Sequence, residues 1–90
     1  MTDRIEVERR ARKELIRLPQ RDQARIVAAI EVLAEHPRPA GCVAVRAAPK
    51  GTYRIRIGDH RVIYVVLDTE QTIVVARIAR RGESTYRGLG

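Results

Sequence analysis

The sequence predicts an α+β protein in which two antiparallel helices cover one face of a four-stranded sheet. In the N-terminal part, the spacing of apolar residues changes from the alternation of a strand to the period of a helix. The C-terminal part holds three runs rich in Ile, Val and Tyr, separated by short turns. A chain of 90 residues with this single pattern is expected to form one domain over residues 1–90. The expected order is a strand, a helix hairpin and a three-stranded antiparallel meander.

A first strand is expected over residues 4–8, where apolar and charged side chains alternate. Over residues 9–18 the apolar side chains follow a helical spacing, and charged side chains cover the other faces. This pattern predicts an amphipathic helix that ends before Pro19. A second helix is expected over residues 20–35, because Pro37 excludes the residue before it from the helical region. The connection between the two helices is so short that they must run antiparallel.

Residues 36–51 are expected to form a loop region, since they hold three of the four prolines. A short extended piece fits residues 42–45 within this loop. Three strands are then expected over residues 52–57, 60–67 and 72–79. The turn between the first two strands has Gly58 in first place, which favours a type II′ hairpin. A polar tail follows over residues 80–90.

Positive charge is concentrated in the C-terminal half of the chain. The net charge is +7, and residues 46–90 hold nine basic and four acidic side chains, against nine and seven in residues 1–45. Nearly all the basic residues are arginines, which suit bidentate phosphate binding and stacking on bases. Such a charge distribution favours a polyanionic partner. With aromatic residues at 3%, all of them tyrosine, the core is expected to consist of Ile, Val, Leu and Ala.

Cys42 is the only cysteine of the sequence, so no disulfide framework is expected. A single thiol and an N-terminus without an apolar run predict a protein of the reducing cytoplasm, without contact to a membrane. No His and Cys residues show the spacing of a metal site, and no glycine-rich phosphate loop occurs. We therefore expect neither a metal ion nor another cofactor.

The turn at Gly58-Asp59 also predicts the register of the hairpin. The expected cross-strand pairs are Ile57 with His60, Arg56 with Arg61, Ile55 with Val62, Arg54 with Ile63, and Tyr53 with Tyr64. Alternation then places an apolar face against the helices and an arginine face on the other side of the sheet. The arginine face comprises Arg54, Arg56 and Arg61. Because Arg56 and Arg61 lie opposite each other, they destabilise the hairpin by about 0.2–1 kcal/mol unless an anion binds between them.

The last strand carries further arginines. Arg80 and Arg81 at its end are expected to add to the anion site. With a regular second turn, Arg77 faces the helices, where an arginine needs a bulge or a partner such as Glu14. The sequence leaves these two explanations for Arg77 open.

The run from Tyr53 to Tyr64 resembles the central hairpin of toxins of the RelE/ParE superfamily. The resemblance extends along the chain to Leu18-Pro19, Gln23-Ala24-Arg25-Ile26, Ala29-Ile30, Arg77-Ile78-Ala79-Arg80-Arg81 and Tyr86. It implies a RelE-like fold and the toxin of a type II toxin–antitoxin system. In RNA-cutting members, this means cleavage of messenger RNA on the ribosome and inhibition of translation. A cognate antitoxin, short and partly acidic and encoded beside the toxin, is implied as a further partner.

The resemblance also implies roles for individual residues. The family's catalytic positions match Arg54, Arg56, Arg61, Arg81 and Tyr86, and RNA-binding positions are expected at Arg46, Lys50, Arg80 and Arg87. The implied reaction is attack of a ribose 2′-hydroxyl on the adjacent phosphate without a metal ion. The best-known member has lysines where Arg54 and Arg56 stand, and arginine does not lose its proton near neutral pH. The general base is therefore unassigned between Tyr86 and His60, although alternation aims His60 away from Arg61.

Three functions remain open from the sequence. The first is a ribosome-dependent endoribonuclease, as the arginine face indicates. The second is inhibition of DNA gyrase, because ParE-like members share the hairpin. The third is a nucleic-acid-binding relative without catalysis, whose affinity for RNA falls with salt.

Overall fold

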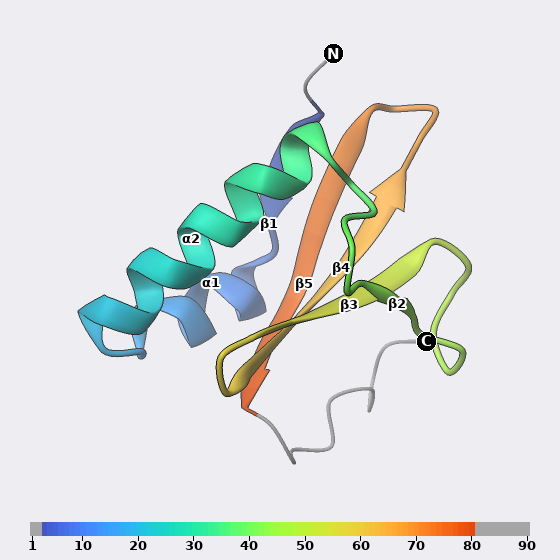
Figure 1. Ribbon diagram of the computed structural model, residues 1–90. Helices are drawn as coiled ribbons and strands as arrows, with labels where there is room; N and C mark the ends of the chain where they lie inside the picture. The colour runs from blue at the N-terminus through green and yellow to red at the C-terminus, as the bar shows by residue number, and fades with distance from the viewer. Residues whose placement is uncertain (1–2, 81–90) are drawn as a thin grey trace.

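The computed structural model describes residues 3–80 as two helices packed on one face of a twisted sheet (Figure 1). The helices are α1 (Arg9–Ile16) and α2 (Gln20–Glu35). The strands are β1 (Arg4–Val7), β2 (Val43–Ala44), β3 (Thr52–Ile57), β4 (His60–Leu67) and β5 (Thr72–Arg80). The predicted α+β class with a helix hairpin and a three-stranded meander is confirmed. Neither helix is long and apolar enough to cross a membrane.

The sheet has the strand order β1-β5-β4-β3-β2, so it contains one strand more than the predicted four. The additional strand is β2, which lies within the extended piece expected in the loop and pairs antiparallel with β3. At the opposite edge, β1 pairs parallel with β5, while the central strands are antiparallel. The first helix is shorter than predicted and ends at Ile16. The bounds predicted for α2, β3 and β4 are confirmed.

The register predicted for the β3–β4 hairpin is confirmed at every pair from Ile57–His60 to Tyr53–Tyr64. Gly58 adopts a φ of 60° at the first central position of the turn. Among the described residues, Gln71 is the only non-glycine with a positive φ, so Asp59 at the second position has a negative one. A positive φ at the first position alone is the type II′ pattern. This turn type matches the right-handed twist of the two strands that it joins.

The core lies between the helices and the sheet face that they cover. Helix α1 contributes Ala11, α2 contributes Ile26, Ile30 and Leu33, and the sheet contributes Val62, Tyr64, Val66, Ile73, Val75 and Ile78. As predicted, nearly all of these side chains are aliphatic. Tyr64 is the largest side chain that is fully buried, and its hydroxyl donates a hydrogen bond of 2.8 Å to the carbonyl oxygen of Pro37. Burial raises the pKa of this hydroxyl, so it remains a donor at neutral pH.

Helix α1 covers the edge of β5 that β1 leaves open. The pairing of β1 with β5 ends at Val75, and beyond it the backbone N–H of Ile78 donates to the Glu14 carboxylate at 2.9 Å. The same carboxylate forms an ion pair of 2.9 Å with the guanidinium of Arg77. A register shift in the β4–β5 pairing also lies between Ile63 and Tyr64. The sequence had left two explanations open for the position of Arg77, a bulge and an ion pair with Glu14. The structure shows both.

The Glu14–Arg77 pair provides a test of this packing. The side chains are 21% and 6% exposed, so Glu14→Ala leaves a buried guanidinium and a strand N–H without their carboxylate. We expect the free energy of unfolding, measured by urea denaturation, to fall by about 3 kcal/mol. The control is Glu6→Ala, which removes an exposed pair with Arg4 and should change the free energy of unfolding by at most about 1 kcal/mol. Equal effects of the two substitutions would contradict this account of the β5 edge.

Candidate anion-binding site

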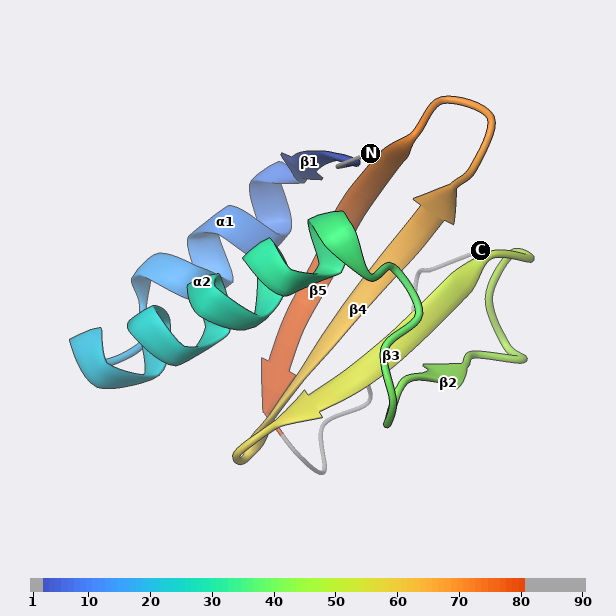
Figure 2. The same cartoon turned by 45° about the horizontal axis from the view of Figure 1, so that its top comes forward.

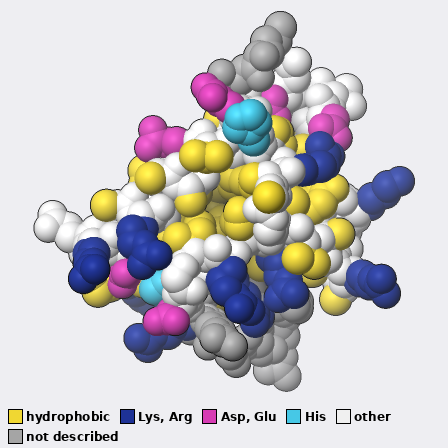
Figure 3. Space-filling model, viewed as in Figure 1, with side chains coloured by type: hydrophobic (Ala, Val, Ile, Leu, Met, Phe, Trp, Pro, Cys, Tyr) yellow, Lys and Arg dark blue, Asp and Glu magenta, His cyan; other side chains and the backbone are white. Residues whose placement is uncertain are grey.

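The structure brings Arg54, Arg56 and Arg61 together on the sheet face that the helices do not cover. The three side chains line a hollow of about 230 Å³ together with Gly41 and Val43. Strand β3 supplies two of the arginines, and β4 supplies the third from the position opposite Arg56. We call these three residues the arginine face. Figure 3 shows Lys and Arg side chains along the lower part of the molecule, over the ends of the helix hairpin on the left as well as toward the right.

The charge of the arginine face is not neutralised within residues 3–80. The ion pairs found there are Arg4–Glu6, Arg38–Asp68 and Arg77–Glu14. The Nε atom of Arg61 is buried and lacks a hydrogen-bond partner in the described part of the chain. A buried donor without an acceptor costs about 1–3 kcal/mol, and the cross-strand repulsion of Arg56 and Arg61 adds to this cost. An oxyanion in the hollow would relieve both.

The other predicted RNA-binding residues lie at different places. Arg46 lines a neighbouring hollow together with Arg54 and Arg61, so it extends the arginine face. Lys50 is exposed in the turn that precedes β3. The predicted residues Arg81, Tyr86 and Arg87 lie outside the described residues.

The expectation that Arg80 adds to the arginine face is wrong. Arg80 pairs with His60 and lines a hollow on the helix side together with Asp22 and Arg25. The physical reason is the register shift between β4 and β5, because one extra residue in a strand moves every later side chain to the opposite face. Without this shift, alternation would place Arg80 on the arginine face.

His60 lies on the helix side of the sheet and is 9% exposed. It lines hollows with Asp22 and Arg80, and its neighbour Arg61 points to the other face. The structure therefore agrees with the direction that alternation predicts for His60, away from the arginine face. No three His, Cys, Asp or Glu side chains within residues 3–80 are grouped so that they could hold a metal ion.

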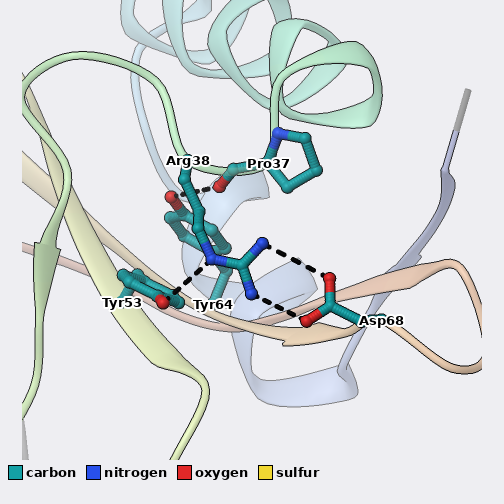
Figure 4. A network of polar contacts seen from close by, with 5 residues as sticks. All are labelled: Pro37, Arg38, Tyr53, Tyr64 and Asp68. Atoms are coloured by element: carbon teal, nitrogen blue, oxygen red, sulfur yellow. Dashed lines mark hydrogen bonds and ion pairs between the residues drawn. The ribbon is translucent and has the colours of Figure 1, made fainter.

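Sequence reasoning missed Arg38, which connects three segments of the chain (Figure 4). Its Nε donates to the hydroxyl of Tyr53 at 2.9 Å, and its two terminal nitrogens donate to the Asp68 carboxylate at 2.8 and 3.3 Å. The Tyr53 ring stacks on Tyr64, whose hydroxyl binds the carbonyl oxygen of Pro37. The Arg38 guanidinium holds the pKa of the Asp68 carboxyl below its usual value. In the sequence, the one feature that singles out Arg38 is its position as a charged residue between Pro37 and Pro39.

Comparison with known proteins identifies the family. The family model for the ParE toxin of type II toxin–antitoxin systems, parDE, matches residues 5–85. The chain belongs to the RelE/ParE toxin superfamily. Among curated proteins, "Putative toxin RelE1" of Methanocaldococcus jannaschii is 35% identical over 86 residues, which cover 92% of this chain and 93% of that protein.

Solved structures show the same fold. The archaeal RelE–RelB complex from Pyrococcus horikoshii matches with a TM-score of 0.81 and 28% identity, over 93% of this chain and all of that one. The toxin–antitoxin complex RelBE2 from Mycobacterium tuberculosis matches with a TM-score of 0.76 and 27% identity, over 90% of this chain and all of the matched chain. The isolated Escherichia coli RelE toxin shares the fold with a TM-score of 0.78. The match has 20% identity and covers 91% of this chain and 87% of that one. The resemblance inferred from the hairpin is thus confirmed, and the chain is a toxin of a type II system of the RelE/ParE kind.

The repulsion within the arginine face can be measured. We expect Arg56→Gln to leave the free energy of unfolding unchanged or to raise it by about 0.2–1 kcal/mol in phosphate-free buffer, because it removes a like-charge pair. Added inorganic phosphate should raise the Tm of the wild type more than that of the variant, since a ligand of the native state stabilises it. Arg54→Gln is the matched control, because Arg54 lies opposite Ile63 and the directly opposed Arg56–Arg61 pair remains. A loss of more than about 1 kcal/mol in Arg56→Gln would contradict the repulsion.

Proposed function

We propose that this toxin inhibits translation by cutting messenger RNA on the ribosome, through attack of a ribose 2′-hydroxyl on the adjacent phosphate. The observation that carries the proposal is the arginine face, where three guanidiniums line one hollow without a carboxylate partner within residues 3–80. Planar guanidiniums bind the oxygens of a phosphate in a bidentate way and keep their charge at every physiological pH.

In this reaction the 2′-oxygen forms a bond to phosphorus, and the bond from phosphorus to the 5′-oxygen breaks. The products are a 2′,3′-cyclic phosphate and a 5′-hydroxyl. Negative charge develops on the oxygens of the phosphorane, and Arg56 and Arg61 lie opposite each other where both can bind it. Arg54 and Arg46 would hold the neighbouring phosphate, and Lys50 and Arg87 would bind the strand farther along. Arg80 would contact a separate stretch of RNA from the helix side.

Two protons must also move, one from the 2′-hydroxyl and one to the 5′-oxygen. The guanidiniums of Arg54 and Arg56 do not accept the first proton, because the pKa of arginine lies far above neutral. His60 is buried on the other side of the sheet. We infer that Tyr86 or groups of the ribosome accept the first proton, and that Arg81 supplies charge or a proton to the leaving oxygen. The protein itself then needs no metal ion.

A cognate antitoxin would keep this activity in check. The related RelE of Pyrococcus horikoshii and RelBE2 of Mycobacterium tuberculosis were solved as toxin–antitoxin complexes. For this chain we propose a short, partly acidic antitoxin, encoded beside the toxin and acting in the cytoplasm. Acidic side chains of such a partner would neutralise the arginine face and compete with RNA for it.

The second candidate function is inhibition of DNA gyrase. The matching family model bears the ParE name, and ParE-like members with this activity share the hairpin. In that case the protein would act by binding, and the arginine face would not cut RNA.

Induction of the toxin in cells, with mapping of messenger RNA ends, separates the candidates. We expect cleavage within codons for the wild type, and a loss of about 100-fold or more for Arg61→Ala, because charge at the developing oxyanion is removed. Arg12→Ala, on the exposed side of α1, is the control and should cleave like the wild type. Intact messengers together with a DNA-damage response would favour gyrase inhibition, and normal growth with intact messengers would contradict both toxic activities.

A further inference from the structure

The loop between α2 and β3 passes from the helix side of the sheet to the arginine face. It leaves α2 at His36, and the carbonyl oxygen of Pro37 is bound by Tyr64 on the helix side. Figure 2 shows the chain running from the end of α2 past β4 and β3 to β2, which lies beside β3 at the edge of the sheet. There, Gly41 and Val43 line the hollow of the arginine face. Residues 36–45, which we call the wall loop, thus form one side of the proposed RNA site.

Few contacts hold the wall loop in place. Strand β2 comprises two exposed residues, and it is fixed to β3 at two pairs, Val43–Arg54 and Ala44–Tyr53. The backbone N–H of Val45 adds a bond of 2.9 Å to the carbonyl oxygen of Thr52. Val45 at the end of the wall loop is buried, but the other residues are exposed or half-buried, and such a segment opens locally at a smaller free-energy cost than the core. Contacts that matter little for global stability therefore decide whether this loop is in place.

Among the described residues, Arg38 makes the most side-chain hydrogen bonds of the wall loop. Its guanidinium donates two hydrogen bonds to the Asp68 carboxylate and a third to the Tyr53 hydroxyl, and it lies 5.3 Å from the Tyr53 ring centroid. Asp68 lies in the turn after β4, so the loop is tied to the two strands that carry the arginine face. Both side chains are largely exposed, at 43% and 70%, so their pair contributes at most about 1 kcal/mol to global stability.

We propose that Arg38 and Asp68 are positioning residues for the arginine face: their ion pair holds the wall loop against β3 and so increases the affinity of the face for RNA. The inference rests on the proposed function. With β2 paired, Val43 lies beside Arg54 and limits the rotamers that its long side chain adopts. Without β2, Arg54 stands on an edge strand, and its side chain must be immobilised when the phosphate binds.

The test uses the sign of the effect on RNA binding. Asp68→Asn removes a negative charge, so electrostatics alone predicts tighter binding to a polyanion. The positioning role predicts the opposite, a loss of about 3- to 10-fold, which corresponds to one additional side chain to be immobilised. The matched control is Glu70→Gln in the same turn, which removes the same charge and has no ion pair within residues 3–80.

The affinity is measured with a fluorescent ten-nucleotide single-stranded RNA at fixed salt. We expect weaker binding for Asp68→Asn and equal or slightly tighter binding for Glu70→Gln, with changes in the free energy of unfolding below about 1 kcal/mol. Hydrogen exchange at the Val45 amide should become faster in Asp68→Asn alone, because this amide reports the closed wall loop.

The outcomes are distinguishable. Binding by Asp68→Asn as tight as by Glu70→Gln would overturn the positioning role, and so would unchanged exchange at Val45. A wild type that does not bind the RNA, while Val45 exchange still responds to Asp68→Asn, would overturn the effect on RNA affinity and leave the ion pair as an anchor of the loop only, whereas the proposed function is tested separately by the mapping of messenger RNA ends.

Discussion

Gly58 adopts a φ of 60° in a two-residue turn, and the register of β3 and β4 follows from this turn. A shift of one residue in either strand would move every side chain of that strand to the other face of the sheet. The turn therefore determines that Tyr64 and Val62 enter the core while Arg54, Arg56 and Arg61 share the opposite face. The helical layer covers one side of the hairpin, and the other side remains available for a charged ligand.

The arginine face combines features that a fold alone does not require. Two guanidiniums lie opposite each other, and the Arg61 Nε is buried without a partner within the described residues. Both features destabilise the protein in the absence of an anion, by an amount that the burial of the aliphatic core readily offsets. Local instability of this kind is expected where a site is formed for a ligand rather than for the stability of the chain. Membership of the RelE/ParE superfamily, whose solved relatives include toxin–antitoxin complexes, is consistent with such a site.

Features that depend on residues close together in the chain could be predicted from the sequence. The hairpin register follows from turn length and a period of two, and the bounds of α2 follow from Pro19 and Pro37. Features that join distant segments were not predictable in this way. The parallel pairing of β1 with β5 and the ion pair of Arg38 with Asp68 arise from the packing of elements far apart in the chain. Arg77 indicated a bulge near the register shift between β4 and β5, but an ion pair with Glu14 explained it equally well, so the sequence did not predict that the shift carries Arg80 away from the arginine face.

The central claim is that the arginine face, rather than another basic surface, binds the RNA. NMR observation of the arginine Nε–Hε signals during titration with a short single-stranded RNA tests it most directly. The account predicts that the signals of Arg54, Arg56 and Arg61 shift first and saturate together, as expected for residues that line one hollow. Earlier shifts of Arg17, Arg25 and Arg80, which line the hollows on the helix side, would contradict it.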